Sequence, residues 1–514
     1  MAFEKNVKNE DAGIMSSKLD ANDDGLKIGL ETHVTLNTQT GLFCGCPAKL
    51  PADALPNQYT CETCLGLPGA KPRLNAKAVE LAVRAAQALD FEVNANSVFA
   101  RKTYYYPDLA KSFQITQYDQ PLALRGRLDV QTPAGQKTVD LTRLHIEEDP
   151  AQIVYPHGNM ANSTYTLLDY NRSGSPLLEI VTEPCLKNPA EAKAYLEELF
   201  RLLAYLGVID SKAERVMKTD ANLSIAGGER VEIKNITSFA AVEKALQSEF
   251  FRQKKMRQSG KPIERQTRLY SEETDTTLLM RTKEQEEDYG YIVEPDLPPL
   301  TLTPEYIESV RATTKELPRV ALARVGKTVP AQFAPVLVYQ DLLPYFESSR
   351  TEDKTLLSRW TCGYLLKAMN YNGIDAPEKA LPVAELDALL EAIRSGKITE
   401  RAAMEYIKKM VTEKKTFAAV MQDGSAGPQK DGVTANDALL VKIISENPKA
   451  VEEYRAGKAK SLEYLVGQFL RQNLGLHPNE VRDKFRKEIE RQKAISTAFG
   501  IAKGASSFDK ELDR

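Results

Sequence analysis

Residues 27–36 read KIGLETHVTL, and two cysteine pairs follow them, Cys44-Gly45-Cys46 and Cys61-Glu62-Thr63-Cys64. In the first stretch apolar and polar residues alternate, which predicts a β-strand with one face in the core. Glu31 and His33 project side by side from the other face. That pair can hold a metal ion or a proton, although a solvated strand face is the simpler interpretation.

The clustered cysteines are four of only six in the 514 residues. Each pair can present two thiolates to one ion, and two pairs complete the tetrahedral shell that Zn²⁺ prefers. Two disulfide bonds are the alternative, but nothing else in the sequence indicates secretion. Because all four thiolates are ligands, no position stays open for a substrate. The sequence therefore predicts a structural zinc, with the chemistry elsewhere.

Length and composition indicate an ordinary globular protein of two or three domains, with 42% hydrophobic and 27% charged residues. No run of about 18 apolar residues occurs, so we expect no membrane span. The net charge of −3 requires any nucleic-acid surface to be a local basic patch. Residues 1–25 are rich in acids and lack arginine, which predicts a disordered leader rather than a targeting peptide. The isolated Cys185 and Cys362 fit a reducing cytoplasm.

The chain changes character about three-fifths of the way along, which predicts an α+β protein. Residues 26–305 form short alternating segments punctuated by Gly, Pro and Asn, as in a strand-rich domain. Residues 306–425 have the spacing of helices, and so do residues 426–514. Between these two helical parts, residues 424–432 contain Gly, Ser and Pro and predict a hinge.

One carboxylate interrupts a strand that is otherwise apolar. The segment Ser175–Thr182 (SPLLEIVT) is apolar on both faces, as in a central strand, except for Glu179. A buried carboxylate needs a cation, an arginine or a shared proton. Arg143–Asp149 (RLHIEED) adds three consecutive acids, and alternation leaves open which of them points inward. Carboxylates with one histidine suit Mg²⁺ or Mn²⁺, and such a Mg²⁺ ion most often serves ATP phosphates.

The sequence carries no familiar nucleotide-binding or nucleophile motif. It has no G-x-x-x-x-G-K-[ST], no G-x-G-x-x-G that opens a helix after a strand, and no G-x-S-x-G. A Gly/Ser-rich amidase loop is also absent, so any amide hydrolysis needs a nucleophile on another chain. Near the C-terminus, the helix predicted over Ser461–Leu474 lies in a moderately basic region. That region can follow an RNA backbone, although charged helix faces are more often simply solvated.

Taken in order, several segments resemble the B-subunit (GatB) family of the tRNA-dependent amidotransferases. They are colinear between residues 28 and 300, and a tail segment is similar to the family's YqeY-like domain. The matching segments are IGLETHVTLNTQTGLFCGCP (28–47), CETCLGLPGAKP (61–72), YYYPDLAKSFQITQYDQPL (104–122), RLHIEEDPA (143–151), LLDYNRSGSPLLEIVTEP (167–184), TDANLSI (219–225), RVEIKNITSF (230–239), MRTKEQEEDYGYIVEPDLPPL (280–300) and LVGQFLRQNLGLHPNEV (465–481).

The resemblance implies a cradle catalytic domain (26–305), a helical domain (306–425) and a YqeY-like tRNA-binding tail (426–514). It also implies a ligase that uses ATP to phosphorylate the side-chain carboxylate of mischarged Glu-tRNA(Gln) or Asp-tRNA(Asn). Ammonia from a partner amidase (A) subunit then displaces the phosphate, and a small C subunit completes a heterotrimer. A function of another class stays open, a non-catalytic tRNA-binding scaffold with a structural zinc.

Residue by residue, the resemblance places the Mg²⁺ ligands at His33, Glu148 and Glu179, with Glu31 beside them. It favours Glu148 over Glu147 among the consecutive acids.

Lys102, Lys218 and Asp220 lie in family motifs near the pocket, and the four cysteines match a zinc site of many members. One departure is Gly290, where members commonly have an arginine. The residues around it run directly into the helical region, without room for the extra domain of the related E subunit.

Overall fold

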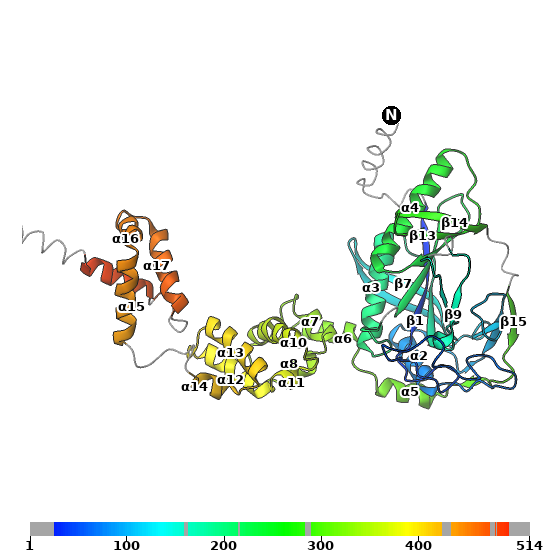
Figure 1. Cartoon of the computed structure of the whole chain (residues 1–514), viewed down its shortest axis with the longest axis horizontal. Helices are drawn as coiled ribbons and strands as arrows, with labels where there is room; N and C mark the ends of the chain where they lie inside the picture. The colour runs from blue at the N-terminus through cyan, green and yellow to red at the C-terminus, as the bar shows by residue number, and fades with distance from the viewer. Residues whose placement is uncertain are drawn as a thin grey trace, which may run out of the picture. The chain divides into compact units, whose positions relative to one another are not determined.

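The structure is a computed structural model that describes residues 25–158, 163–213, 216–282, 289–423, 433–472, 479 and 481–492. The chain divides into two compact units, Met1–Leu317 and Pro318–Arg514 (Figure 1). The first unit contains the described strands and the second is helical, which confirms the expected α+β class. The finer division into cradle, helical and tail domains stays a prediction.

A nine-stranded sheet dominates the first unit, in the order β14-β13-β12-β11-β1-β10-β7-β6-β2. The strand β1 lies at its centre and pairs antiparallel with β10 and β11. The bounds are β1 (Lys27–Thr35), β2 (Glu92–Val93), β6 (Ala123–Thr132), β7 (Gly135–Glu148), β10 (Pro176–Thr182), β11 (Met217–Ser224), β12 (Val231–Ile236), β13 (Gln266–Ser271) and β14 (Thr276–Thr282).

Three helices cover one face of this sheet: α2 (Ala76–Ala88), α3 (Pro189–Tyr205) and α4 (Phe239–Gln258) (Figure 1). The side chains of Asn188 and Ser238 cap the N-termini of α3 and α4. The even-numbered apolar residues of β1 and β10 pack into the core under these helices. The odd-numbered residues therefore face the other way, as the alternation in residues 27–36 predicts. We call that second surface the polar face.

A smaller sheet lies at the end of β7. It has the order β15 (Gly290–Val293), β4 (Ala100–Thr103), β5 (Phe113–Thr116). Hydrogen bonds from β5 tie the two sheets together, because Gln114 Nε2 donates to the Glu148 carbonyl at 2.7 Å. Two further pairs join β16 (Leu300–Thr301) to β3 (Asn96–Ser97) and β8 (Gln152–Val154) to β9 (Leu167–Asp169). The helix α5 (Pro304–Ala312) also belongs to the first unit.

The second unit is built from short helices. They are α6 (Pro318–Val325), α7 (Ala334–Tyr339), α8 (Leu343–Ser348), α9 (Lys354–Arg359), a π-helical turn (Trp360–Leu365), α10 (Leu366–Asn372), α11 (Pro377–Ala380), α12 (Val383–Arg394), α13 (Glu400–Glu413), α14 (Phe417–Gln422), α15 (Val433–Glu446), α16 (Pro448–Arg455) and α17 (Ala459–Gln472). The last three share a core with Phe485 and Ile489. The predicted hinge at 424–432 and the leader up to residue 24 lie outside the described residues. No helix in the described part of the chain is long and apolar enough to span a membrane.

Candidate active site and metal centres

Four side chains from three neighbouring strands meet on the polar face. In the register of the sheet, His33 of β1 lies opposite Glu179 of β10, which lies opposite His145 of β7. Glu147 projects from β7 two residues further on, to the same side. We call these four residues the His–Glu cluster. His145 was not among the residues predicted from the sequence, although it shares the parity of Glu147 on β7.

The contacts within the cluster are short. His33 Nε2 lies 3.2 Å from Glu147 Oε1 and 3.2 Å from Glu179 Oε2. His145 Nε2 lies 3.2 Å from Glu179 Oε2 and 3.6 Å from Glu147 Oε2. Glu147, Glu179 and His145 are buried, so water cannot screen the two carboxylates from each other.

Burial disfavours the charged form of every group in the cluster, but the attraction between imidazolium and carboxylate outweighs this cost. The two carboxylates raise the pKa of His145 to about 9 and the pKa of His33 well above its usual value. Hydrogen bonds from the imidazoles bring the pKa of Glu147 to about 2, against burial and the Glu179 charge. The same histidines hold the pKa of Glu179 well below its usual value. The pair of buried carboxylates thus requires positive charge.

A divalent cation fits that requirement. His33 and the two carboxylates each offer one ligand atom, and these three atoms all lie within 4.8 Å of one another. Two carboxylate oxygens and one imidazole nitrogen make a donor set that suits Mg²⁺ or Mn²⁺.

Glu148, which the resemblance placed among the Mg²⁺ ligands, does not lie in this group. Glu147 and Glu148 are consecutive on a strand, so their side chains point to opposite faces. The Glu148 carboxylate accepts hydrogen bonds from Lys111 Nζ at 2.5 and 2.6 Å and from the Ile115 backbone N–H at 2.8 Å. The structure therefore brings together His33, Glu147 and Glu179.

The other polar candidates lie beside the cluster on the same face. Glu31 accepts a hydrogen bond from Asn222 at 2.8 Å, and burial together with neighbouring carboxylates raises its pKa. Asp220 lies opposite Glu31 and accepts a hydrogen bond from Lys234 Nζ at 2.7 Å. Lys218 is in register with the β1 histidine. The sheet thus pairs Glu31 with Asp220, and Lys218 follows two residues away on the same strand, opposite the cluster.

Lys102 projects from β4 between two aromatic rings. Its Nζ lies 4.9 Å from the ring centre of Tyr289 and 5.8 Å from that of Tyr104, as in cation–π contacts. Burial raises the pKa of Tyr104, and the charges of Asp108 and Glu147 add to that shift. Lys102 forms no ion pair with a carboxylate among the described residues, and its charged group contacts the two tyrosine rings.

Gly290 of β15 lies opposite Thr103. A Cβ added at Gly290 would meet the Thr103 Cβ at 3.7 Å, an ordinary contact. Packing therefore does not impose the glycine at this position.

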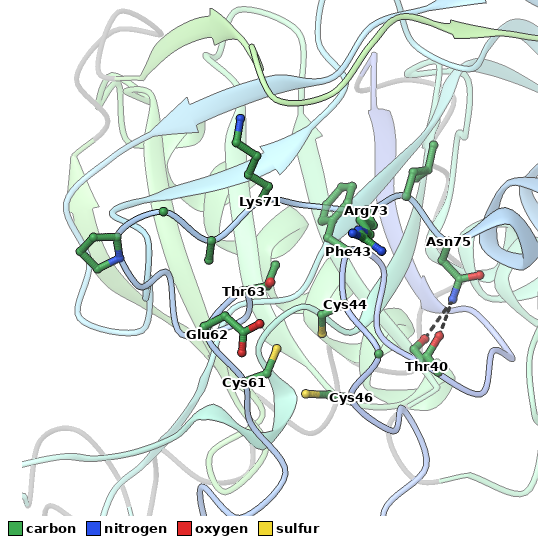
Figure 2. A pocket seen from close by; sticks show the side chains of 15 residues that line it. Thr40, Phe43, Cys44, Cys46, Cys61, Glu62, Thr63, Lys71, Arg73 and Asn75 are labelled. Carbon is green, nitrogen blue, oxygen red and sulfur yellow. Dashed lines mark hydrogen bonds between the residues drawn. The ribbon is translucent and has the colours of Figure 1, made fainter.

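The four cysteines form a second centre. Cys64 Sγ lies 3.8 Å from Cys61 Sγ and 4.0 Å from Cys46 Sγ, and all four sulfurs lie within 4.8 Å of one another. In a tetrahedral site with Zn–S bonds of about 2.3 Å, neighbouring sulfurs are about 3.8 Å apart. The cysteines are free rather than disulfide-bonded, so their arrangement fits zinc. Figure 2 shows three of the sulfurs turned toward one another in a cavity of about 1150 Å³.

The loop that carries Cys64 is hydrogen-bonded to the segment that leads into β10, the strand of Glu179. Ser173 Oγ donates a hydrogen bond to the Cys64 carbonyl at 2.8 Å. The next residue, Gly174, donates its N–H to the Asp149 carbonyl at 2.9 Å and accepts one from Leu42 at 2.8 Å. Gly174 has φ +81°, and a Cβ there would meet Cys64 at 3.6 Å. The cysteine loops thus support the segment that follows Glu147.

Comparison with known proteins assigns the chain to a family. Residues 26–308 match the family described as "GatB/GatE catalytic domain", and residues 344–489 match the one described as "GatB domain". The B subunit of the aspartyl/glutamyl-tRNA(Asn/Gln) amidotransferase of Carboxydothermus hydrogenoformans is 37% identical over 475 residues, which cover 90% of this chain and 98% of the relative. The corresponding protein of Methanospirillum hungatei is 39% identical over 461 residues, 87% of this chain and 94% of the relative. The chain therefore belongs to the GatB/GatE family, among the B subunits of the aspartyl/glutamyl-tRNA(Asn/Gln) amidotransferases.

Proposed function

We propose that this chain is the transamidase subunit of a glutamine-dependent tRNA amidotransferase. In this proposal it amidates the side-chain carboxylate of mischarged Glu-tRNA(Gln), Asp-tRNA(Asn) or both, in an ATP-dependent reaction in the cytoplasm. The observation that carries the proposal is the buried His–Glu cluster, which lies inside the part of the chain that matches the catalytic-domain family.

The cluster supplies what transfer of a phosphoryl group to a carboxylate needs. His33, Glu147 and Glu179 would hold one Mg²⁺ ion, which when bound offsets the repulsion between the triphosphate and the substrate carboxylate. Lys102, held by two tyrosine rings, donates its N–H groups to phosphoryl oxygens. The sheet fixes these groups before the substrate arrives, so little reorganisation is needed during the reaction.

Ammonia has to come from a partner in this proposal. The sequence has no amidase-type nucleophile loop, and the relatives are named as B subunits, which indicates a complex of several different chains. We infer that an amidase (A) subunit supplies the ammonia, with a small C subunit as the third component. The helices α15, α16 and α17 would bind tRNA, and the four cysteines would hold a structural zinc.

The test separates a catalytic subunit from a tRNA-binding scaffold. The reconstituted complex should hydrolyse ATP in a manner that depends on mischarged Glu-tRNA(Gln) or Asp-tRNA(Asn). The His33→Ala variant should lose this hydrolysis while it still binds tRNA, because the histidine is remote in sequence from the predicted tail. A scaffold predicts that the variant and the wild type behave alike.

A further inference from the structure

We propose that His145 is a positioning residue that sets the affinity of the His–Glu cluster for its divalent cation, by donating the Nε2–H hydrogen bond to Glu179. This inference rests on the proposed function only in so far as a cation occupies the cluster. It gives the two histidines different tasks, with His33 as a ligand and His145 as the group that orients a ligand.

The geometry supports this division. His145 is 3% exposed and lies directly opposite Glu179 in the sheet register. Its Nε2 is 3.2 Å from Glu179 Oε2 and 3.6 Å from Glu147 Oε2, so only the first contact has a normal hydrogen-bond length. His145 is also absent from the set of three residues whose ligand atoms gather within 4.8 Å.

Both imidazole rings of the cluster have a second nitrogen that lacks a partner. Nδ1 of His145 and Nδ1 of His33 are buried and have no hydrogen-bond partner within the described part of the chain, so this nitrogen does not distinguish the two histidines. The role of His145 as a donor to Glu179 rests instead on its 3.2 Å contact and on its absence from the set of gathered ligand atoms.

Glu179 needs such a partner because its other contacts are shared or long. Its Oε2 also faces His33, and among the described residues its Oε1 has only Arg143 as a charge partner, at 3.8 Å. When His33 gives its Nε2 lone pair to a cation, that nitrogen no longer donates to Glu179. His145 then remains the buried donor that holds the carboxylate in place. Partners of this kind typically change metal affinity by about 10- to 100-fold.

The test compares variants at position 145 in the full-length chain within its complex. His145→Gln keeps an N–H at about the reach of Nε2, His145→Asn stops one bond short, and His145→Leu has no donor. Mn²⁺ serves as the probe, and its dissociation constant is measured by electron paramagnetic resonance without ATP. We expect Leu and Asn to weaken Mn²⁺ binding by about tenfold or more and Gln to restore most of it.

A second measurement keeps the proposal open to refutation if the Leu variant does not fold. Pulsed resonance of Mn²⁺ bound to the wild type should show one coordinated imidazole nitrogen, from His33. Two coordinated nitrogens would make His145 a ligand and overturn the proposal. Wild-type affinity in a folded Asn or Leu variant would also overturn it, while the proposed function would stand. If the wild type binds no Mn²⁺ and His33→Ala leaves activity intact, the proposed function itself fails.

Discussion

Glu147→Gln and Glu148→Gln should affect cation affinity and stability in opposite ways, because consecutive residues of β7 point to opposite faces of the sheet. Glu147→Gln removes one ligand charge from the His–Glu cluster. We expect cation affinity to fall by about 10- to 100-fold, as for loss of a group that supports a metal site. That range corresponds to about 1.4–2.8 kcal/mol of binding free energy. Folding should survive, since the variant also relieves the repulsion between Glu147 and Glu179.

Glu148→Gln should instead lower the stability and leave cation affinity nearly unchanged. Glu148 and Lys111 are largely buried, with side-chain exposures of 5% and 14%. Removing the carboxylate leaves the Lys111 ammonium without its counter-charge, at a cost on the order of 3 kcal/mol. The contact with Ile115 N–H also weakens, because an amide oxygen is a poorer acceptor than a carboxylate.

The assay measures both quantities on each variant: Mn²⁺ binding by resonance titration and the free energy of unfolding by urea denaturation of the isolated chain. The wild type and Glu179→Gln are the references, and Glu179→Gln should behave like Glu147→Gln. Our reasoning is refuted if Glu148→Gln weakens Mn²⁺ binding as much as Glu147→Gln does. It is also refuted if Glu147→Gln binds the cation like the wild type, because Glu147 would then lie outside the coordination shell.

Three further predictions concern other parts of the chain. Cys61→Ser should lower both the zinc content, measured by elemental analysis of reduced protein, and the melting temperature, because it removes one of four converging sulfurs; full zinc occupancy in this variant would contradict the Cys₄ site. Lys102→Met should lower tRNA-dependent ATP hydrolysis by about tenfold or more, because it removes a donor to phosphoryl oxygens. Its stability should change little, since the lysine has no carboxylate partner among the described residues. Equal rates of hydrolysis in the variant and the wild type would exclude a role in phosphate binding. Truncation after Asp423 removes helices that share their own core, so it should raise the KM for aminoacyl-tRNA and spare glutamine hydrolysis by the partner; an unchanged KM would show that the tail does not bind tRNA.

Alternation within single segments predicted much of this site. The pattern of residues 27–36 placed Glu31 and His33 on the face away from the core, and the structure puts the helices on the opposite face. The apolar run around Glu179 indicated a central strand, and β10 lies next to β1 near the middle of the sheet. The four cysteines could be grouped from their spacing alone, because both pairs lie within one short stretch. In each case the information is local.

The position of Glu148 relative to the cluster could not be predicted, because it depends on information that is not local. The parity of β7 is visible in RLHIEED, where His145 and Glu147 share one face and Glu148 the other. Which of those faces meets His33 depends on the register between β7, β10 and β1, and these strands are far apart in the sequence. A shift of one residue would exchange the faces and bring Glu148 into the cluster.

A one-residue shift would move Leu144 and Ile146 of β7 out of the core, and the position of Lys111 adds an electrostatic reason against it. Placing Glu148 on the helix-covered face buries a carboxylate, and burial raises its pKa above the usual value. The Lys111 ammonium and the Ile115 N–H of β5 offset this cost, while Thr116 Oγ1 of the same strand donates to Glu147 at 3.2 Å. Glu147, on the polar face, finds its charge partners in His33 and His145. The two adjacent acids thus reinforce the register that the apolar residues set, because each contacts its compensating charge on a different face.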